Sequence, residues 1–395
     1  MTGEQMTLVG MISGTSMDGI DVAGANFQLE DDCVSIEPLG SKSVPYSEDL
    51  LRDLRAALPP ATTSAADITR LDNEIGRAFA DAARQGIREL APGTQFVVSH
   101  GQTIFHWVEE GSVRGTLQIG EPTWIAEATG LPVVARLRVA DVAAGGQGAP
   151  LASLFDSLLL SGTQRRSVSL NLGGIANLTF VAPGSDPIAY DTGPANALID
   201  AAMAHITSGR KAIDEDGAVG ASGQIDRDLL DVLLAEPYYS ESYPKTTGKE
   251  LFHLPYLLAA LEKVDPVSDA DLVATVTALS AITVADACKA HDAEEVVVAG
   301  GGVANPTLMA MLREQMPDVE VRILDELGLS AASKEAYFIA LIGFLTVHEL
   351  PGNIPTATGA TRPVIMGDLL PGRDGFHLPP RHHIAPTRLR IVTER

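Results

Sequence analysis

Cysteine, aromatic residues and positive charge are all scarce in this sequence of 395 residues. The two cysteines, Cys33 and Cys288, show no paired spacing, which argues against a disulfide framework or a zinc site and is typical of a reducing compartment. Lysine and arginine total 28 against 51 acidic residues, so the net charge is −23. This charge argues against nucleic acid or an anionic membrane surface as the main partner. An anionic ligand must then be held by local backbone donors and a few cations.

Long hydrophobic runs are also absent. The longest apolar segment, 336–347, is far short of the ~20 residues that span a bilayer, and it predicts a buried helix. Residues 1–5 have neither the basic nor the apolar region of a secretion signal. We therefore expect a cytoplasmic protein with no membrane and no nucleic-acid partner. A hydrophobic content of 45% and a length of 395 residues are typical of a soluble globular chain with two domains.

The stretch 8–26 predicts a strand, a tight turn and a second strand. Gly14 and Gly19 supply the turn conformations, and the backbone N–H groups can form a nest for the phosphates of a nucleotide. Asp18 and Asp21 would lie beside those phosphates, where a bound cation makes carboxylates favourable. Further donors are the hydroxyl groups of Ser13, Thr15 and Ser16. The alternative is an ordinary hairpin in which glycine and aspartate serve only the turn.

The same pattern returns at 167–181, where a strand again enters a glycine turn and a strand leaves it. Each copy is followed by an apolar strand that ends in a polar or glycine-rich loop, at 96–103 and at 296–302. The internal repeat predicts two similar halves that face one another and hold a polyphosphate between two hairpins. The glycine loops match neither a dinucleotide fingerprint nor a P-loop.

Between the two copies lies a second candidate for chemistry. A strand from 132 is predicted to end at Arg138 and Asp141, before a glycine-rich turn and a helix to about Leu160. A carboxylate at such a strand end suits a general base, and Arg138 suits a phosphate or carboxylate partner. The alternative is an Arg–Asp ion pair that holds the turn. In the preceding loop, 99–106, polar side chains favour contact with a small polar ligand over a metal site, and the alternative is a structural histidine with satisfied hydrogen bonds.

Apolar periodicity predicts helices over 64–90, 197–206 and 269–290. A strand at 296–299 leads into three glycines, and Asn305 and Pro306 are then predicted to cap and begin a helix through Leu312. The end of the chain has no apolar period and predicts a flexible tail.

These motifs together resemble the anhydro-N-acetylmuramic acid kinases of the sugar kinase–Hsp70–actin ATPase superfamily, over about residues 8–370. The matching motifs occur in order along the chain: Met11 to Asp21, Ser99 to Thr103, Gln118 to Pro122, Asp141 to Leu151, Asn171 to Thr179, Asp191 to Pro194, Pro244 to Gly248, Gly300 to Gly302, Lys334 to Ala336 and Thr358 to Ala360.

The resemblance implies an α/β fold of two actin-like (ribonuclease H-like) domains with the active site in the cleft between them. Domain I would comprise 1–138 and about 336–370, domain II 139–335, and the tail 371–395. The implied activity uses ATP and Mg²⁺ to open the 1,6-anhydro bridge of the sugar with water and to phosphorylate O6. The product is N-acetylmuramic acid 6-phosphate, in peptidoglycan recycling. The implied partner is a small-molecule anhydrosugar. The resemblance leaves open whether the protein forms a homodimer.

The resemblance also implies roles for individual residues. Asp141 is the implied catalytic base, and Asp18 the implied Mg²⁺ ligand. The implied ATP contacts are Gly14, Thr15, Ser16, Met17, Asp18, Gly19, Ile20, Asp21, Asn171, Gly173, Gly174, Gly300, Gly301 and Gly302. The implied sugar contacts are His100, Gln102, Glu121, Arg138 and Glu335.

Two positions depart from the family pattern. Arg136-Leu137-Arg138 stands where the family has Asp-Phe-Arg, so a cation replaces a carboxylate near the expected sugar site. Ile12 stands where methionine is usual. The change at Arg136 keeps three alternatives open: a kinase for another anhydrosugar such as levoglucosan, a weakly catalytic nucleotide-binding protein of the same fold, and an ordinary hexose kinase.

Overall fold

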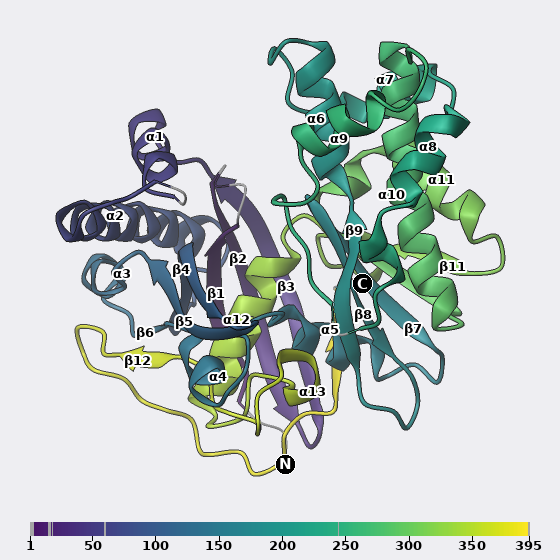
Figure 1. The fold of residues 1–395 in the computed structure, drawn as a ribbon. Coiled ribbons are helices and arrows are strands. Elements are labelled where there is room, and N and C mark those ends of the chain that lie inside the picture. The colour runs from purple at the N-terminus through teal and green to yellow at the C-terminus, as the bar shows by residue number, and fades with distance from the viewer. Residues whose placement is uncertain (1–3, 15–16, 18, 59–60, 244, 394–395) are drawn as a thin grey trace. The chain divides into compact units, whose positions relative to one another are not determined.

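The structure is a computed structural model that describes residues 4–14, 17, 19–58, 61–243 and 245–393. Packing divides the chain into unit 1, within Met1–Gly162 and Gly328–Arg395, and unit 2, Thr163–Leu327 (Figure 1). Each unit is mixed α/β and contains its own sheet.

The sheet of unit 1 has the order β12-β6-β4-β1-β2-β3-β13, with β5 added to β4. In chain order the strands are β1 (Met6–Ser13), β2 (Ile20–Glu30), β3 (Cys33–Val44), β4 (Phe96–Glu109), β5 (Ser112–Ile119), β6 (Val133–Ala135), β12 (Asp368–Leu370) and β13 (Arg388–Ile391). The first three strands form an antiparallel meander, and β4 and then β6 extend it in parallel from β1.

Two long helices cover the two faces of this sheet, α2 (Ala65–Glu89) and α12 (Lys334–Val347) (Figure 1). Val9 and Met11 of β1 belong to the apolar core beneath α2. Gly10 between them points the other way, and a Cβ there would lie 2.2 Å from the Ala336 oxygen of α12. Only glycine therefore permits this close approach. The shorter helices of unit 1 are α1 (Glu48–Ala56), α3 (Thr123–Thr129), α4 (Val139–Ala143), α5 (Ala152–Leu160) and α13 (Pro355–Thr358).

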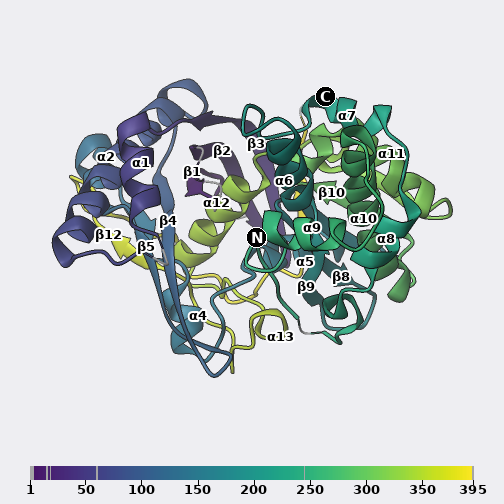
Figure 2. The same cartoon turned by 45° about the horizontal axis from the view of Figure 1, so that its top comes forward.

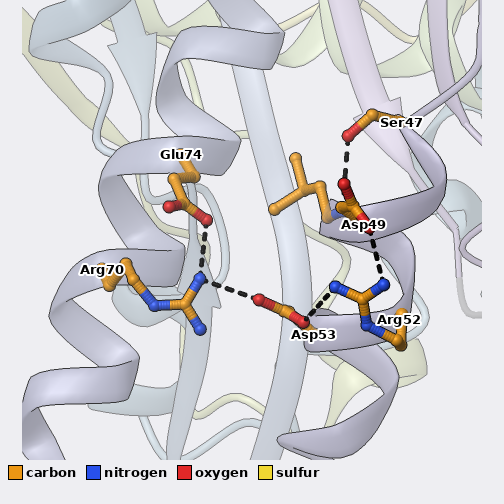
Figure 3. A network of polar contacts seen from close by, with 7 residues as sticks. Ser47, Asp49, Arg52, Asp53, Arg70 and Glu74 are labelled. Atoms are coloured by element: carbon orange, nitrogen blue, oxygen red, sulfur yellow. Dashed lines mark hydrogen bonds and ion pairs between the residues drawn. The ribbon is translucent and has the colours of Figure 1, made fainter.

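A network of ion pairs joins α1 to α2 (Figure 3). Arg70 lies 2.9 Å from Asp53 and 3.0 Å from Glu74, and Arg52 lies 2.6 Å from Asp49. Because these side chains are 32 to 84% exposed, solvent screens the pairs and each contributes little to stability. Fully burying Leu54 of α1 contributes roughly 1.5–3 kcal/mol, so the apolar contact dominates the packing of this helix.

The sheet of unit 2 has the order β11-β10-β7-β8-β9. Its strands are β7 (Ser167–Leu172), β8 (Ile175–Val181), β9 (Ile188–Pro194), β10 (Glu295–Ala299) and β11 (Glu320–Ile323). Its α-helices are α6 (Asn196–Ile206), α7 (Ala218–Ser222), α8 (Arg227–Leu234), α9 (Leu254–Leu261), α10 (Asp269–Ala290) and α11 (Pro306–Gln315) (Figure 2). Helix α10 has the length and composition of a membrane span, but 78% of its most apolar window is buried inside the structure, as expected for a core helix.

The two sheets share one topology. In unit 2, β7, β8 and β9 form an antiparallel meander, and β10 and then β11 extend it in parallel from β7. This matches β1, β2, β3, β4 and β6 of unit 1 strand for strand. The predicted internal repeat and the ribonuclease H-like α/β fold are therefore confirmed. The predicted helices over 64–90 and 269–290, and the predicted Asn305 cap of α11, are also confirmed.

Three details differ from the predictions. Strand β4 continues through the expected loop 99–106, because this stretch pairs with β5 as an antiparallel ribbon. Strand β6 ends at Ala135, so Arg138 precedes α4 and Asp141 lies inside it instead of at a strand end. In the predicted tail, β13 pairs in parallel with β3.

The unit boundaries also lie elsewhere than the predicted domain boundaries. The predicted division at 138/139 and 335/336 placed α4 and α5 in domain II. Packing places both helices in unit 1, where α4 contacts β5 and α5 contacts β13 and α12. The observed divisions follow Gly162 and Leu327.

Candidate functional site

The glycine turn of unit 2 connects β7 and β8. The carbonyl groups of Gly173 and Gly174 accept from the backbone N–H groups of Asn196 (3.0 Å) and Ala195 (2.9 Å), at the start of α6. Asn196 Nδ2 also donates to the Gly173 oxygen at 2.8 Å. Among the described residues, nothing accepts from the N–H groups of Gly173 and Gly174. A turn whose carbonyls are bonded and whose N–H groups are available suits an anion.

The loop of three glycines packs against the end of β7. Gly300 has φ +88°, and a Cβ there would lie 2.5 Å from Asn171 Oδ1. Any side chain at Gly300 would therefore be both strained and in collision. At Gly301 a Cβ would meet nothing within 4 Å. The predicted contacts Asn171 and Gly300 thus lie side by side in unit 2 next to the exposed Gly301, whereas Gly302 is buried against Leu172.

A carboxylate that the sequence analysis did not single out, Asp191, lies on β9 three residues before Pro194. Its Oδ2 accepts from Thr246 Oγ1 (2.6 Å) and from the Thr247 N–H (3.0 Å). The residue is half-buried, and burial raises the pKa of Asp191 above its ordinary value, opposed by these two hydrogen bonds. An accessible carboxylate with a raised pKa is suited to general base catalysis.

Two lysines, Lys245 and Lys249, lie in the same segment of unit 2 as Thr246 and Thr247. Lys249 lies beside the glycine turn, with Cε 3.1 Å from the position of a Cβ on Gly174. It lowers the pKa of Asp200, which burial raises to about 6. Lys249 is exposed and supplies positive charge next to the turn, in a chain with a large negative net charge.

The glycine turn of unit 1 connects β1 and β2. Thr15, Ser16 and Asp18 of the predicted ATP contacts lie outside the described residues. Met17 has φ +57°, and its N–H donates to the Gly14 oxygen at 3.2 Å, which closes the turn. A Cβ on Gly19 would lie 2.8 Å from the Val44 oxygen. Ile20 is buried, and Asp21 pairs with Ile12 across the hairpin.

Three predicted sugar contacts of unit 1 are Gln102, beside this turn, and the pair His100 and Arg138. Gln102 Nε2 donates to the oxygens of Gly14 (3.2 Å) and Thr103 (3.1 Å). Arg138 Nε donates to His100 Nε2 at 2.8 Å, so the His100 proton is on Nδ1, where it reaches the Gly101 oxygen. Burial and the charge of Arg138 lower the pKa of His100 to about 3. The imidazole is therefore neutral at physiological pH.

Glu335 is the second residue of α12 and faces the same charges. Desolvation by surrounding protein raises its pKa, while Arg138 and Lys334 lower it and Asp21 raises it. The carboxylate is solvent-accessible. Its neighbour Lys334 instead forms an ion pair with Asp156 of α5, and both side chains are 5% exposed. The structure therefore brings Arg138, Glu335 and Asp21 into electrostatic contact.

Asp141 is completely buried. Its Oδ1 accepts from Asn353 Nδ2 and Thr358 Oγ1, both at 2.7 Å, and its Oδ2 accepts from the Gly148 N–H at 2.8 Å. A Cβ on Gly146 would lie 2.2 Å from Oδ2, so this loop closes over the carboxylate. In this arrangement Asp141 holds the glycine-rich turn in place and has no access to water.

Two further residues have local partners in unit 1. Glu121 Oε1 accepts from the N–H of Thr123, the first residue of α3, at 2.9 Å. Only its second oxygen remains for a ligand. Arg136 has φ +56°, and its Nε lies 2.6 Å from Asp368 Oδ2 of β12. The cation that replaces the family's carboxylate is thus neutralised by a residue of the neighbouring strand.

Comparison with known proteins accounts for this combination of repeated fold and glycine turns. Residues 6–372 match the family model described as anhydro-N-acetylmuramic acid kinase. The anhydro-N-acetylmuramic acid kinase of Streptomyces coelicolor is 53% identical over 389 residues, which cover 98% of this chain and 99% of the relative. Those of Streptomyces avermitilis and Rhodococcus erythropolis are 55% and 52% identical, each covering 97 to 98% of this chain and 99% of the relative. The chain belongs to the anhydro-N-acetylmuramic acid kinase family.

Proposed function

We propose that the protein is an ATP-dependent kinase that opens the 1,6-anhydro bridge of 1,6-anhydro-N-acetylmuramic acid with water and phosphorylates O6. The product is N-acetylmuramic acid 6-phosphate. The observation that carries the proposal is the identity of 52 to 55% with kinases of this name over almost their whole length. The repeated glycine turns, one in each unit, support it.

ATP is the phosphoryl donor in this proposal. In unit 2, the Gly173–Gly174 turn is the proposed phosphate contact and the loop Gly300–Gly302 the proposed adenosine contact. In unit 1, the proposed phosphate contacts among the described residues are Gly14, Met17, Gly19, Ile20 and Asp21. Mg²⁺ bound to the phosphates would neutralise charge that develops during transfer. Its predicted ligand, Asp18, lies outside the described residues, and the described residues contain no group of three metal-ligating side chains. Phosphate oxygens and water would then supply most of its ligands.

Two carboxylates are candidates for the general base. Sequence resemblance implies Asp141, and the geometry favours Asp191. A base must touch the water that it activates. Asp141 is fully buried and accepts three hydrogen bonds, whereas Asp191 is half-buried, has a raised pKa and lies on the strand that precedes the start of α6. We therefore propose Asp191 as the base and Asp141 as the residue that holds the 146–148 turn.

The sugar contacts are proposed in unit 1. Arg138 offers hydrogen bonds to sugar oxygens, and the accessible Glu335 offers an acceptor for a hydroxyl or amide group. The buried His100 and Gln102 instead hold Arg138 and the Gly14 turn in place. The levoglucosan alternative rests on the cation at Arg136. Because Asp368 pairs with that cation, Arg136 gives little reason for a changed substrate.

A substrate panel tests the proposal. ADP release is measured with ATP, Mg²⁺ and each of 1,6-anhydro-N-acetylmuramic acid, levoglucosan and N-acetylmuramic acid. We expect the highest kcat/KM for the first sugar. A preference for levoglucosan would show that the protein is a kinase for another anhydrosugar. A preference for N-acetylmuramic acid would show an ordinary sugar kinase. If no sugar stimulates ADP release, the protein is a weakly catalytic nucleotide-binding protein.

A further inference from the structure

The segment 245–249 is anchored by one lysine. Lys245 Nζ donates to the carbonyl oxygens of Tyr238 (3.0 Å) and Tyr239 (3.1 Å), and it lies 4.6 Å from the centroid of the Tyr238 ring. Two charge-assisted hydrogen bonds and a cation–π contact fix this point of the chain. The function proposed above gives no role to Lys245 or to the threonines that follow it.

The anchored segment contacts both the backbone and one carboxylate oxygen of Asp191. The Lys245 carbonyl accepts from the Asp191 N–H at 3.2 Å, and the Tyr238 hydroxyl donates to the Asp191 carbonyl at 2.7 Å. Thr246 and Thr247 then both donate to Oδ2. Among the described residues, none donates to Oδ1. The carboxylate is thus held by one oxygen, and the other is available.

We propose that Thr246, placed by Lys245, is a positioning residue that turns Asp191 so that Oδ1 receives the proton of the attacking water. This inference rests on the proposed function, in which Asp191 is the base. Thr246 is exposed, so its hydroxyl serves no apolar core. Its bond to Oδ2 satisfies the oxygen that does not take the proton and restricts rotation of the carboxyl group.

The proposed step uses one water molecule, the anhydrosugar and ATP. A water O–H bond breaks, its proton moves to Asp191 Oδ1, and the water oxygen bonds to the anomeric carbon. The bond from that carbon to O6 breaks, and its electron pair stays on O6. O6 then bonds to the γ-phosphorus of ATP while the bond to the β,γ-bridging oxygen breaks, and that electron pair leaves with ADP. Asp191 finally releases the proton to solvent.

The charges around Asp191 give the direction of the expected pH effect. Burial and the negative charge of Glu250 raise its pKa, and the hydrogen bonds from Thr246 and Thr247 lower it. The nearby Lys245 and Tyr238 contact its backbone. Loss of the Thr246 hydroxyl therefore raises the pKa further. Since a base acts only when deprotonated, the acid limb of kcat/KM then moves to higher pH.

The test compares three variants of the full chain in pH profiles of kcat/KM for 1,6-anhydro-N-acetylmuramic acid. Thr246→Val removes the hydroxyl at nearly constant shape, and we expect its acid limb to move up by about one pH unit. Thr246→Ser keeps a hydroxyl and should restore the limb. Thr247→Val is the matched control, because Thr247 bonds Asp191 through its backbone N–H, so its limb should stay in place.

The outcomes separate the inference from the function on which it rests. An acid limb that is the same in the parent, Thr246→Val and Thr246→Ser proteins overturns the positioning role. A limb shifted equally by Thr246→Val and Thr247→Val also overturns it, since a general disturbance of the loop would then be the cause. If Asp191→Asn keeps the parent's kcat, the assignment of the base fails instead.

Discussion

At the scale of single residues, two aspartates differ mainly in what surrounds them. Asp141 is enclosed by donors that lie 212 and 217 residues further along the chain, Asn353 and Thr358. Asp191 is held on one oxygen by a loop about 55 residues away. The sequence shows both as aspartates near glycine-rich turns, and it does not show which of them is buried.

The substitutions Asp191→Asn and Asp141→Asn should have opposite effects. Asp191→Asn cannot take a proton from water, so kcat should fall by ~10²–10⁴-fold with the melting temperature almost unchanged. In Asp141→Asn, an amide NH₂ must face at least one of three donors, which costs roughly 1–3 kcal/mol of stability. Kinetics and thermal melts measure both. An inactive but fully stable Asp141→Asn protein would return the role of base to Asp141.

The glycine loop of unit 2 allows a matched pair of alanine variants. Gly300→Ala combines a positive φ with a Cβ 2.5 Å from Asn171 Oδ1, and we expect a loss of about 1–3 kcal/mol and weaker ATP binding. Gly301→Ala adds a methyl group where nothing lies within 4 Å and should keep the parent's melting temperature. Equal melting temperatures for the two variants would contradict this account of the loop.

At the scale of elements, α12 is tied to α5 by the buried pair of Lys334 and Asp156, next to the proposed sugar contact Glu335. Lys334→Met removes the cation that pairs with the buried Asp156 carboxylate and should cost about 3–5 kcal/mol in urea unfolding. Lys334→Met combined with Asp156→Leu should recover most of this loss. Arg52→Ala, which breaks only exposed pairs, is the control and should leave the free energy of unfolding almost unchanged. A Lys334→Met protein as stable as this control would show that the pair does not hold α12.

Elements with a clear apolar period were predictable, and those without one were not. Helices α2 and α10 have capping residues, Ser64 and Ser268, and apolar faces or cores that the sequence displays directly. The stretch 105–109 of β4 is exposed, so no alternation of buried and exposed residues marks it as a strand. Its pairing with β5 decides its structure, and a local pattern does not contain that pairing.

At the scale of the whole molecule, the repeat was the most predictable feature. Glycine turns at 14–19 and 173–174, each followed by a later parallel strand, indicated the common topology of the two sheets. The predicted ATP contacts of unit 2 come together because they follow neighbouring strands β7 and β10. The unit boundaries were not predictable, because α4 and α5 belong to unit 1 only through contacts with distant strands and helices.

The central claim, that water opens the anhydro bridge while ATP phosphorylates O6, is tested most directly by isotope incorporation. The reaction with ATP, Mg²⁺ and 1,6-anhydro-N-acetylmuramic acid is run in ¹⁸O-labelled water, and the sugar phosphate is analysed by mass spectrometry. The account predicts one ¹⁸O atom per product molecule, on the anomeric carbon, and one ADP per product. With N-acetylmuramic acid as control substrate, any product formed should carry no label beyond slow exchange. An unlabelled product from the anhydrosugar, or ADP without a sugar phosphate, would contradict the account.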